Sequence, residues 1–135
     1  MYRLKVADFH YGAFLSALLN TPGGRPSLFD ETGSRRIYRL ETNNNSECYF
    51  YAKYVKDTKH KNEKFSHWVF NFTDAEIAKL QELRNEKGNV KLVLICVKEG
   101  FAGSELAIVD YEDAVTAKSY PIALKSSICS ESFSN

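Results

Sequence analysis

Hydrophobic residues near the start of the chain recur at the spacing of one helical face. The side chains that follow this i, i+3, i+4, i+7, i+8 pattern are Tyr11, Phe14, Leu15, Leu18 and Leu19. Asp8 precedes them at the place of an N-cap, whose side chain satisfies a free backbone N–H group. Proline and glycine in the segment Asn20 to Gly24 then stop the helix. The pattern therefore predicts a helix from near Asp8 to Leu19.

The next segment, residues 22–34, holds two prolines, three glycines and several polar side chains. This composition is typical of a loop. Leu28 and Phe29 are an apolar pair within it, and we expect them to pack onto the core.

Alternating side chains then predict three strands, over residues 36–42, 48–55 and 66–72. Turn-forming residues at 43–46 join the first two strands, so a hairpin is the simplest pairing. The third strand gives the clearest alternation in the chain. Its buried face is expected to consist of Trp68, Phe70 and Phe72.

A second helix is predicted by a capping box, in which Thr73 and Glu76 each satisfy a free backbone N–H at the helix start. Ile77, Leu80 and Leu83 form its apolar stripe, and Gly88 ends it.

Four further segments complete the predicted order. Residues 90–97 are almost continuously apolar, as in a strand buried on both faces. We expect another strand at 105–109, a short helix over 110–118, an edge strand at 120–127 and a frayed end at 130–135. The order α-β-β-β-α-β-β-(α) indicates one α+β domain over residues 1–135. Its mainly antiparallel sheet, of about five strands, would be packed by two main helices.

Composition excludes few functions. The formal net charge is +1, so the whole molecule has no strong electrostatic signature. No signal peptide is recognisable, and the longest apolar run is too short to cross a bilayer. Three widely spaced cysteines do not suggest a disulfide framework. These features favour a cytoplasmic protein without a membrane partner.

No motif indicates catalysis. His10, His60 and His67 lack the short spacings that mark a zinc site. Nucleophile elbows and phosphate-binding loops are absent from the sequence. We therefore predict no catalytic residue, no metal ligand and no cofactor, and an enzyme is the less favoured interpretation.

A modest signal for nucleic-acid binding lies on the second strand and the basic segment after it. Strand aromatics can stack on bases while neighbouring cations contact phosphates, although tyrosines on strands also pack against each other and lysine-rich loops are commonly only solvated. The candidate residues are Arg35, Arg36, Arg39, Tyr49, Tyr51, Lys53, Lys56, Lys59, Lys61 and Lys64.

The predicted order α-β-β-β-α-β resembles the core of the PD-(D/E)xK nucleases in topology. The resemblance implies a divalent-metal site with an Asp on one strand and an acid two residues before a Lys on the next. Its nearest match pairs Asp30 or Glu47 with the segment Tyr51-Ala52-Lys53. Tyr51 stands where that family has the acid, and a phenol cannot hold Mg²⁺ as a carboxylate does.

Three hypotheses follow. The favoured one is a non-catalytic binding or interaction module, whose partner is nucleic acid or another protein. The first alternative is a degenerate metal-dependent nuclease-like domain, with carboxylates of Asp30, Glu41 or Glu47 near Lys53. The second alternative is an oligomeric structural or interaction protein, because sheet edges and numerous aromatics invite self-association.

Overall fold

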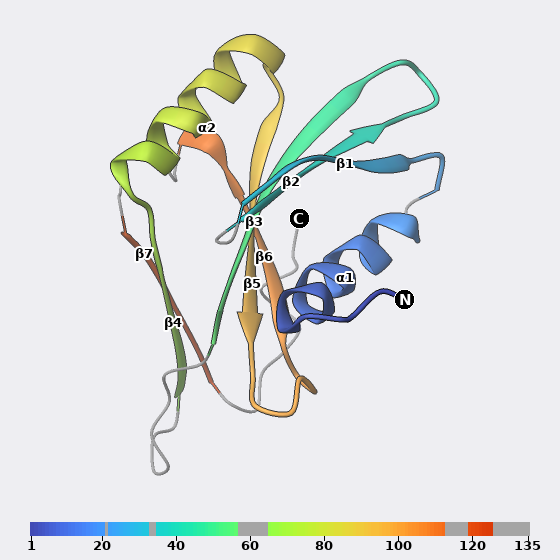
Figure 1. The fold of residues 1–135 in the computed structure, drawn as a ribbon. Coiled ribbons are helices and arrows are strands. Elements are labelled where there is room, and N and C mark those ends of the chain that lie inside the picture. Colours follow the sequence, from blue (N-terminus) through green and yellow to red (C-terminus); the bar gives the residue numbers. More distant parts are fainter. Residues whose placement is uncertain (21, 33–34, 57–64, 113–118, 126–135) are drawn as a thin grey trace.

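The computed structural model describes residues 1–20, 22–32, 35–56, 65–112 and 119–125. Its elements form an α+β fold with a five-stranded sheet and a separate two-stranded sheet (Figure 1). They are α1 (Val6–Leu19), β1 (Arg25–Glu31), β2 (Arg36–Glu41), β3 (Glu47–Lys56), β4 (Phe65–Asn71), α2 (Asp74–Lys87), β5 (Val90–Val97), β6 (Glu105–Asp110) and β7 (Ser119–Lys125). The predicted α+β class with two main helices is thereby confirmed, whereas the observed order of elements has an additional strand, β1, after the first helix.

The five-stranded sheet has the order β1-β2-β3-β5-β6 and is mixed. Three neighbouring pairs are antiparallel, including the predicted hairpin of β2 and β3. β3 and β5 run parallel. This is possible because β4 and α2, which lie between them in the sequence, return the chain to the end of the sheet at which β3 begins. β5 is the apolar strand that the sequence predicts, lying inside the sheet between β3 and β6, and Leu92 and Val93 on its two faces are fully buried.

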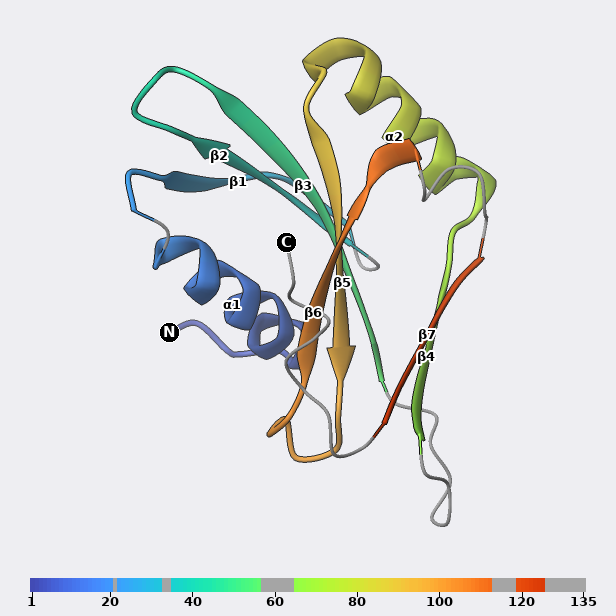
Figure 2. The ribbon, with the colours of Figure 1, turned by 180° about the vertical axis from the view of Figure 1, so that it is seen from behind.

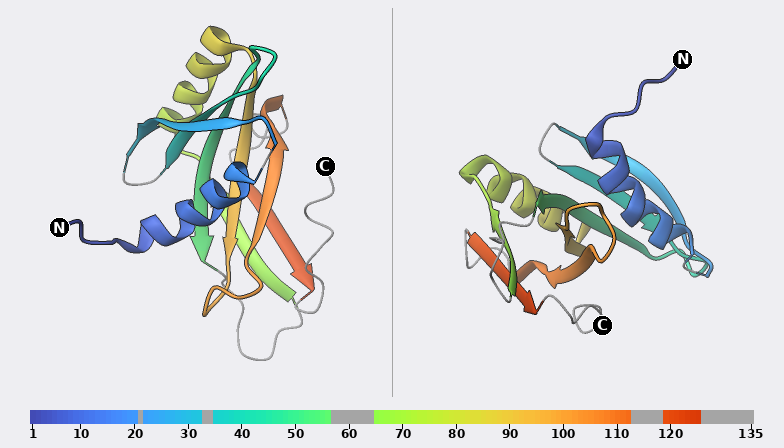
Figure 3. Two further views of the ribbon diagram at one scale, coloured as in Figure 1. Left: turned by 90° about the vertical axis from the view of Figure 1, so that its right-hand side faces the viewer. Right: turned by 90° about the horizontal axis from the view of Figure 1, so that it is seen from below.

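The main sheet is the middle of three layers. α1 covers one face, while α2 and the β4–β7 pair cover the other (Figures 2 and 3). Each face has its own apolar cluster. Tyr11, Phe14 and Leu18 of α1 pack on one side, and Trp68, Phe70 and Leu80 pack on the other.

α1 ends at Leu19 as predicted, but its start and the burial of Leu19 differ from the prediction. Lys5 is the N-cap, and Asp8 is the third helical residue, whose carboxylate accepts the Lys5 backbone N–H at 2.7 Å. An acid at that position reaches back to the cap as the Glu of a capping box does. Leu19, expected on the buried face, is 65% exposed. At about 100° per residue, its side chain lies too far round the helix from Phe14 and Leu18 to reach the sheet.

β1 lies in the segment that composition predicts as a loop, so that prediction is wrong. It is an edge strand, where Pro26 is tolerated because one side needs no ladder hydrogen bond. The pairing with β2 shifts between Leu28 and Asp30. Leu28 is 52% exposed, contrary to the expectation, whereas Phe29 is 43% exposed and packs one side of its ring against the core residue Tyr49.

β4 does not join the main sheet, contrary to the single layer that the sequence suggests. It pairs antiparallel with β7, the strand predicted at 120–127. Burial of its aromatic face is confirmed, because Trp68 and Phe70 are inaccessible to solvent. The Trp68 Nε1–H donates to the Val97 carbonyl at 2.9 Å and so ties β4 to β5.

α2 follows its prediction closely. Thr73 and Glu76 exchange the two capping-box hydrogen bonds, at 3.0 and 3.1 Å, and Gly88 ends the helix with φ of 83°. The predicted short helix at 110–118 falls mostly outside the described residues, although Asp110 itself ends β6. The frayed end predicted at 130–135 also lies outside them.

Candidate functional site

The two tyrosines proposed to stack on bases lie in the core. Tyr49 is 3% exposed and Tyr51 is 0% exposed, on the face of β3 that α2 and β4 cover. The Tyr49 ring packs edge-on against Phe29, with ring centroids 5.1 Å apart. Burial raises the pKa of the Tyr51 phenol, and the nearby Glu76 carboxylate raises it further. Neither ring offers a face to a base in this structure.

Lys53 lies beside Tyr51 and is held by α2 instead of by a strand carboxylate. Its ammonium group contacts Glu76 Oε2 at 2.9 Å and donates to the Asn71 carbonyl at 2.7 Å. Tyr51 donates to the same Glu76 oxygen at 3.2 Å. Desolvation opposes ionisation of Glu76, but hydrogen bonds from the Thr73 N–H and from Lys53 outweigh it, so its pKa lies below the usual range. The pair is largely buried, with both side chains 12% exposed.

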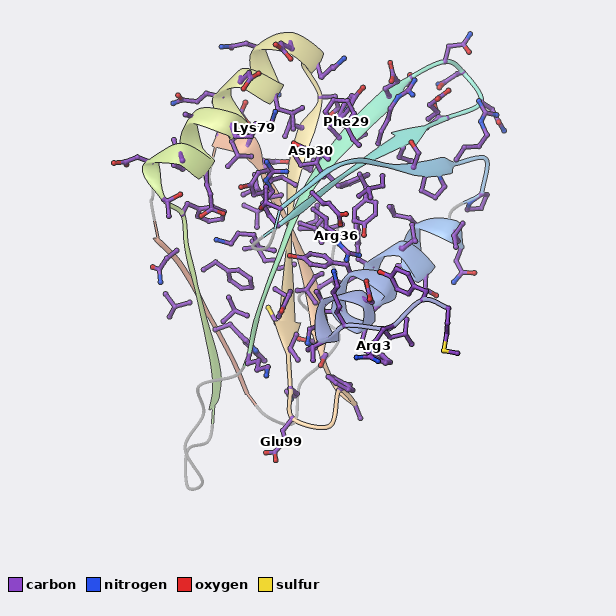
Figure 4. The ribbon with its side chains drawn as sticks, in the orientation of Figure 1. Arg3, Phe29, Asp30, Arg36, Lys79 and Glu99 are labelled. Carbon is purple, nitrogen blue, oxygen red and sulfur yellow. The ribbon has the colours of Figure 1, made fainter. Side chains whose placement is uncertain are left out.

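Asp30 and Arg35 extend these contacts toward the edge of the sheet. Arg35 Nη1 lies 3.2 Å from Asp30 Oδ2, and its guanidinium group sits 5.6 Å from the centre of the Tyr51 ring. Figure 4 shows Asp30 and Lys79 close together below α2, with 3.9 Å between Lys79 Nζ and Asp30 Oδ2. We call Asp30, Arg35, Tyr51, Lys53 and Glu76 the Lys53 network.

The other two arginines of the predicted patch point to different surroundings. Arg36 contacts Asp8 at 3.0 Å and Glu31 at 3.1 Å, and it lies over the Tyr11 ring on the α1 side. Arg39 forms ion pairs with two acids at the hairpin end of β2 and β3. Those acids are Glu41 and Glu47.

The structure therefore does not assemble the predicted nucleic-acid patch from the described candidates. Two are buried rings, and Arg35, Arg36, Arg39 and Lys53 are all in ion pairs. Lys56 is exposed at the end of β3. Lys59, Lys61 and Lys64 lie outside the described residues.

The carboxylates required by the nuclease alternative are distributed differently from the expectation. Glu41 and Glu47 pair in register at one end of the hairpin, six residues along β3 from Lys53. Asp30 lies nearer, because its partner Ile37 pairs in turn with Tyr51. Among the described residues, no cluster of three or more His, Cys, Asp or Glu side chains could hold a metal ion.

A surface that the sequence analysis did not single out lies on α1. Val6, Phe9, Ala13 and Ser16 are exposed on the side away from the sheet, with Gly12 half-exposed between them. We call these five residues the outer face of α1. Val6 and Phe9 are each 55% exposed, and the Phe9 ring stacks on the similarly exposed Phe101 ring with centroids 6.4 Å apart. The signal was available in the sequence, since Asp8 is the only charged residue in this 14-residue helix.

His10 lies beneath this surface and is 3% exposed. Its ring centroid is 4.4 Å from that of Tyr54 and 5.3 Å from that of Phe101. Nε2 has no hydrogen-bond partner among the described residues. Burial lowers the pKa of His10, and the positive charge of Lys56 lowers it further. The imidazole is therefore held neutral as part of the packing between α1 and the sheet.

Comparison with known proteins adds no relative: no family model matches the sequence, and no curated protein or solved structure is significantly similar to it. Within the described part of the chain, neither helix has the length and apolar character needed to cross a membrane.

Proposed function

We propose that the chain is a non-catalytic interaction module whose binding surface is the outer face of α1. One observation carries this proposal: an exposed helical surface has Val6 and Phe9 at its start, no charged residue, and Phe101 stacked beside it. A surface helix of a monomer normally carries charged or polar residues on its outer side.

The chemistry of this surface favours a protein partner. Contiguous exposed apolar side chains mark contact sites, and aromatic residues are enriched at the centre of protein interfaces while charged residues are depleted there. Phe9 and Phe101 supply the aromatic anchor, and Ala13 and Ser16 continue the surface as a shallow, uncharged strip. We keep the cytoplasm as the expected compartment.

Photo-cross-linking in cells tests the proposal. A photoreactive phenylalanine analogue is placed at Ala13, or at Ala78 as a matched exposed alanine on α2. We expect a discrete adduct from position 13 and none from position 78. The Phe9→Glu substitution should abolish that adduct, because it places a charge in the contact. Adducts of equal yield at both positions, or none at position 13, would contradict the proposal.

Nucleic acid is the other partner class that the sequence suggests, through Lys56 and the basic residues after it. A mobility-shift assay at low salt tests it, since phosphate contacts weaken steeply as salt rises. We expect no specific shift, because the described cations of the predicted patch, other than Lys56, are in ion pairs. A salt-sensitive shift that disappears on charge reversal of Lys56, Lys59 and Lys61 would favour nucleic acid over the outer face of α1.

The nuclease-like alternative receives support from one arrangement, the Lys53 network. Two carboxylates, from Asp30 and Glu76, lie on the same side of the sheet as Lys53. Each of them is already paired with a cation of the chain, Asp30 with Arg35 and Glu76 with Lys53. We therefore expect no cleavage of DNA or RNA with Mg²⁺ or Mn²⁺. Metal-dependent cleavage that Glu76→Gln abolishes would establish this alternative instead.

A further inference from the structure

Gly12 in the middle of α1 has no explanation within the described chain. Glycine in a helix interior is less stable than alanine, so a protein normally keeps it for a turn or a close approach. Gly12 is not among the glycines with positive φ, so its backbone does not require glycine. A Cβ atom built on it would meet no atom within 4 Å, so no neighbour in the described residues requires the space.

The side chains around Gly12 point to a partner that resembles this helix. Ala13 and Ser16 are small and Phe9 is large, so the outer face of α1 has a raised end and a flat remainder. No charge lies on the face, so an oppositely charged partner would gain nothing there. Close approach of another helix is the arrangement in which a missing Cβ at position 12 is useful.

We propose that the occupant is a second copy of this chain, docked with its α1 antiparallel across the outer face of the first. This proposal rests on the proposed function and names the partner of the same surface. A two-fold axis between Gly12 and Ala13 places these two residues opposite each other. The same axis places each Phe9 ring over Ser16 of the other copy, so the raised end of one face meets the flat part of the next. Such an interface is isologous and closes at two subunits.

Charge at the two ends of α1 agrees with this orientation. Lys5, at the N-cap, and Arg3, labelled in Figure 4, are exposed and form no ion pair within the described residues. The last turn of α1 contains no basic residue to offset the partial negative charge of its carbonyl groups. The same two-fold axis brings Lys5 of each copy to the C-cap Asn20 of the other. A parallel pair would place the cations of the two copies together.

Among the described residues, no helix or strand lies over the outer face of α1, whose side chains are exposed. α1 is the outermost layer on its side of the sheet in each view (Figures 1 and 3). The main sheet, α2 and the β4–β7 pair all lie on the side of α1 that carries its buried residues, away from the outer face.

Sedimentation velocity of the full chain tests the self-association. We expect a concentration-dependent dimer for the native sequence. Gly12→Leu should raise the dimer dissociation constant by at least about tenfold, because its side chain occupies the crossing point. Ala78→Leu, a matched substitution on exposed α2, should leave the constant unchanged. Far-ultraviolet circular dichroism of each variant confirms that it is folded. A native chain that remains monomeric, or a dimer that ignores Gly12→Leu, overturns the proposal.

Cysteine cross-linking tests the orientation in a background where Cys48 and Cys129 are replaced by serine. An equimolar mixture of Phe9→Cys and Ser16→Cys chains should form the 9–16 disulfide on mild oxidation. Predominant 9–9 and 16–16 disulfides would indicate a parallel pair and overturn the antiparallel arrangement. A monomeric chain whose Ala13 probe still cross-links to a different protein would overturn the second copy as occupant and leave the proposed function standing. Absence of both the dimer and the adduct would overturn both.

Discussion

At the scale of single residues, several ion pairs join side chains that are far apart in the sequence, so their spacing in the chain does not predict them. Lys53 on β3 meets Glu76 on α2, and Arg36 on β2 meets Asp8 on α1. The capping box predicted a local role for Glu76 but gave no sign of its second partner. Alternation on β3 separated the two faces correctly, with Tyr49 and Tyr51 on one face and Tyr54 on the other. Which tyrosines are buried depends on the packing of β4 and α2, which alternation does not contain.

The Lys53–Glu76 pair should contribute measurably to stability. Glu76→Gln keeps the shape but leaves Lys53 buried without its counter-charge. We expect the free energy of unfolding to fall by about 2 kcal/mol, the usual size for a buried hydrogen bond to a charged group. Urea denaturation measures it. Glu82→Gln on the exposed side of α2 is the control and should change stability by less than about 0.5 kcal/mol. Equal losses in the two variants would contradict the role given to Glu76.

Buried His10 predicts a dependence of stability on pH. Because burial lowers its pKa below the ordinary value of 6.5, the unfolded chain binds a proton more readily than the folded chain does. The contribution of His10 is therefore fully present above pH 6.5 and is lost as the pH falls from 6.5 through the lower folded-state value. Urea denaturation between pH 7.5 and pH 5 measures this loss.

The matching variant is His10→Phe, which keeps an aromatic ring between Tyr54 and Phe101. It should flatten the change in stability over that pH range, whereas His60→Gln should not. A His10→Phe protein with the native pH profile would show that another group titrates there.

At the scale of elements, local sequence signals were sufficient to predict a helix or strand wherever residues at its two ends mark its boundaries. α2 has a capping box and a terminal glycine, and β5 is almost continuously apolar, so their positions were predicted almost residue by residue. β1 was missed because Pro26 and the surrounding glycines suggest a loop. Only its pairing with β2, which is not encoded in the segment itself, makes it a strand.

Two glycines should respond to alanine in opposite directions. Gly12→Ala should raise the free energy of unfolding of the monomer by about 0.5–1 kcal/mol, because alanine favours helix and the space is open. Gly88→Ala should lower it by about 1 kcal/mol, because φ of 83° is unfavourable for a residue with a Cβ atom. Urea denaturation of dilute protein measures both. Loss of stability in Gly12→Ala would show that the site is not open.

At the scale of the whole molecule, the α+β class followed from the order of elements, but the layering did not. Trp68, Phe70 and Phe72 were correctly expected to be buried, and the sequence does not say that Trp68 and Phe70 belong to a second sheet. The pairing of β4 with β7 joins segments some fifty residues apart, and such non-local contacts leave no local pattern. The outer face of α1 was not predicted for a different reason. Hydrophobic periodicity identifies the buried side of a helix, whereas the unusual feature here is the absence of charged residues from the exposed side.

The fluorescence of Trp68 reports on the packing of the two-stranded sheet against the main sheet. Trp68 is the single tryptophan, and its indole N–H bonds to the Val97 carbonyl. We expect blue-shifted emission that resists acrylamide quenching until the protein unfolds. Trp68→Phe should reduce the free energy of unfolding by about 2 kcal/mol through the lost hydrogen bond and the cavity. Emission typical of an exposed indole in the folded protein would contradict the packing of β4 on β5.

Cross-linking from Ala13 in living cells tests whether the uncharged outer face of α1 is a contact surface. We expect a discrete adduct at Ala13, none at Ala78, and loss of the first when Phe9 becomes Glu. Equal labelling from the two helices, or an Ala13 adduct that survives Phe9→Glu, would contradict it.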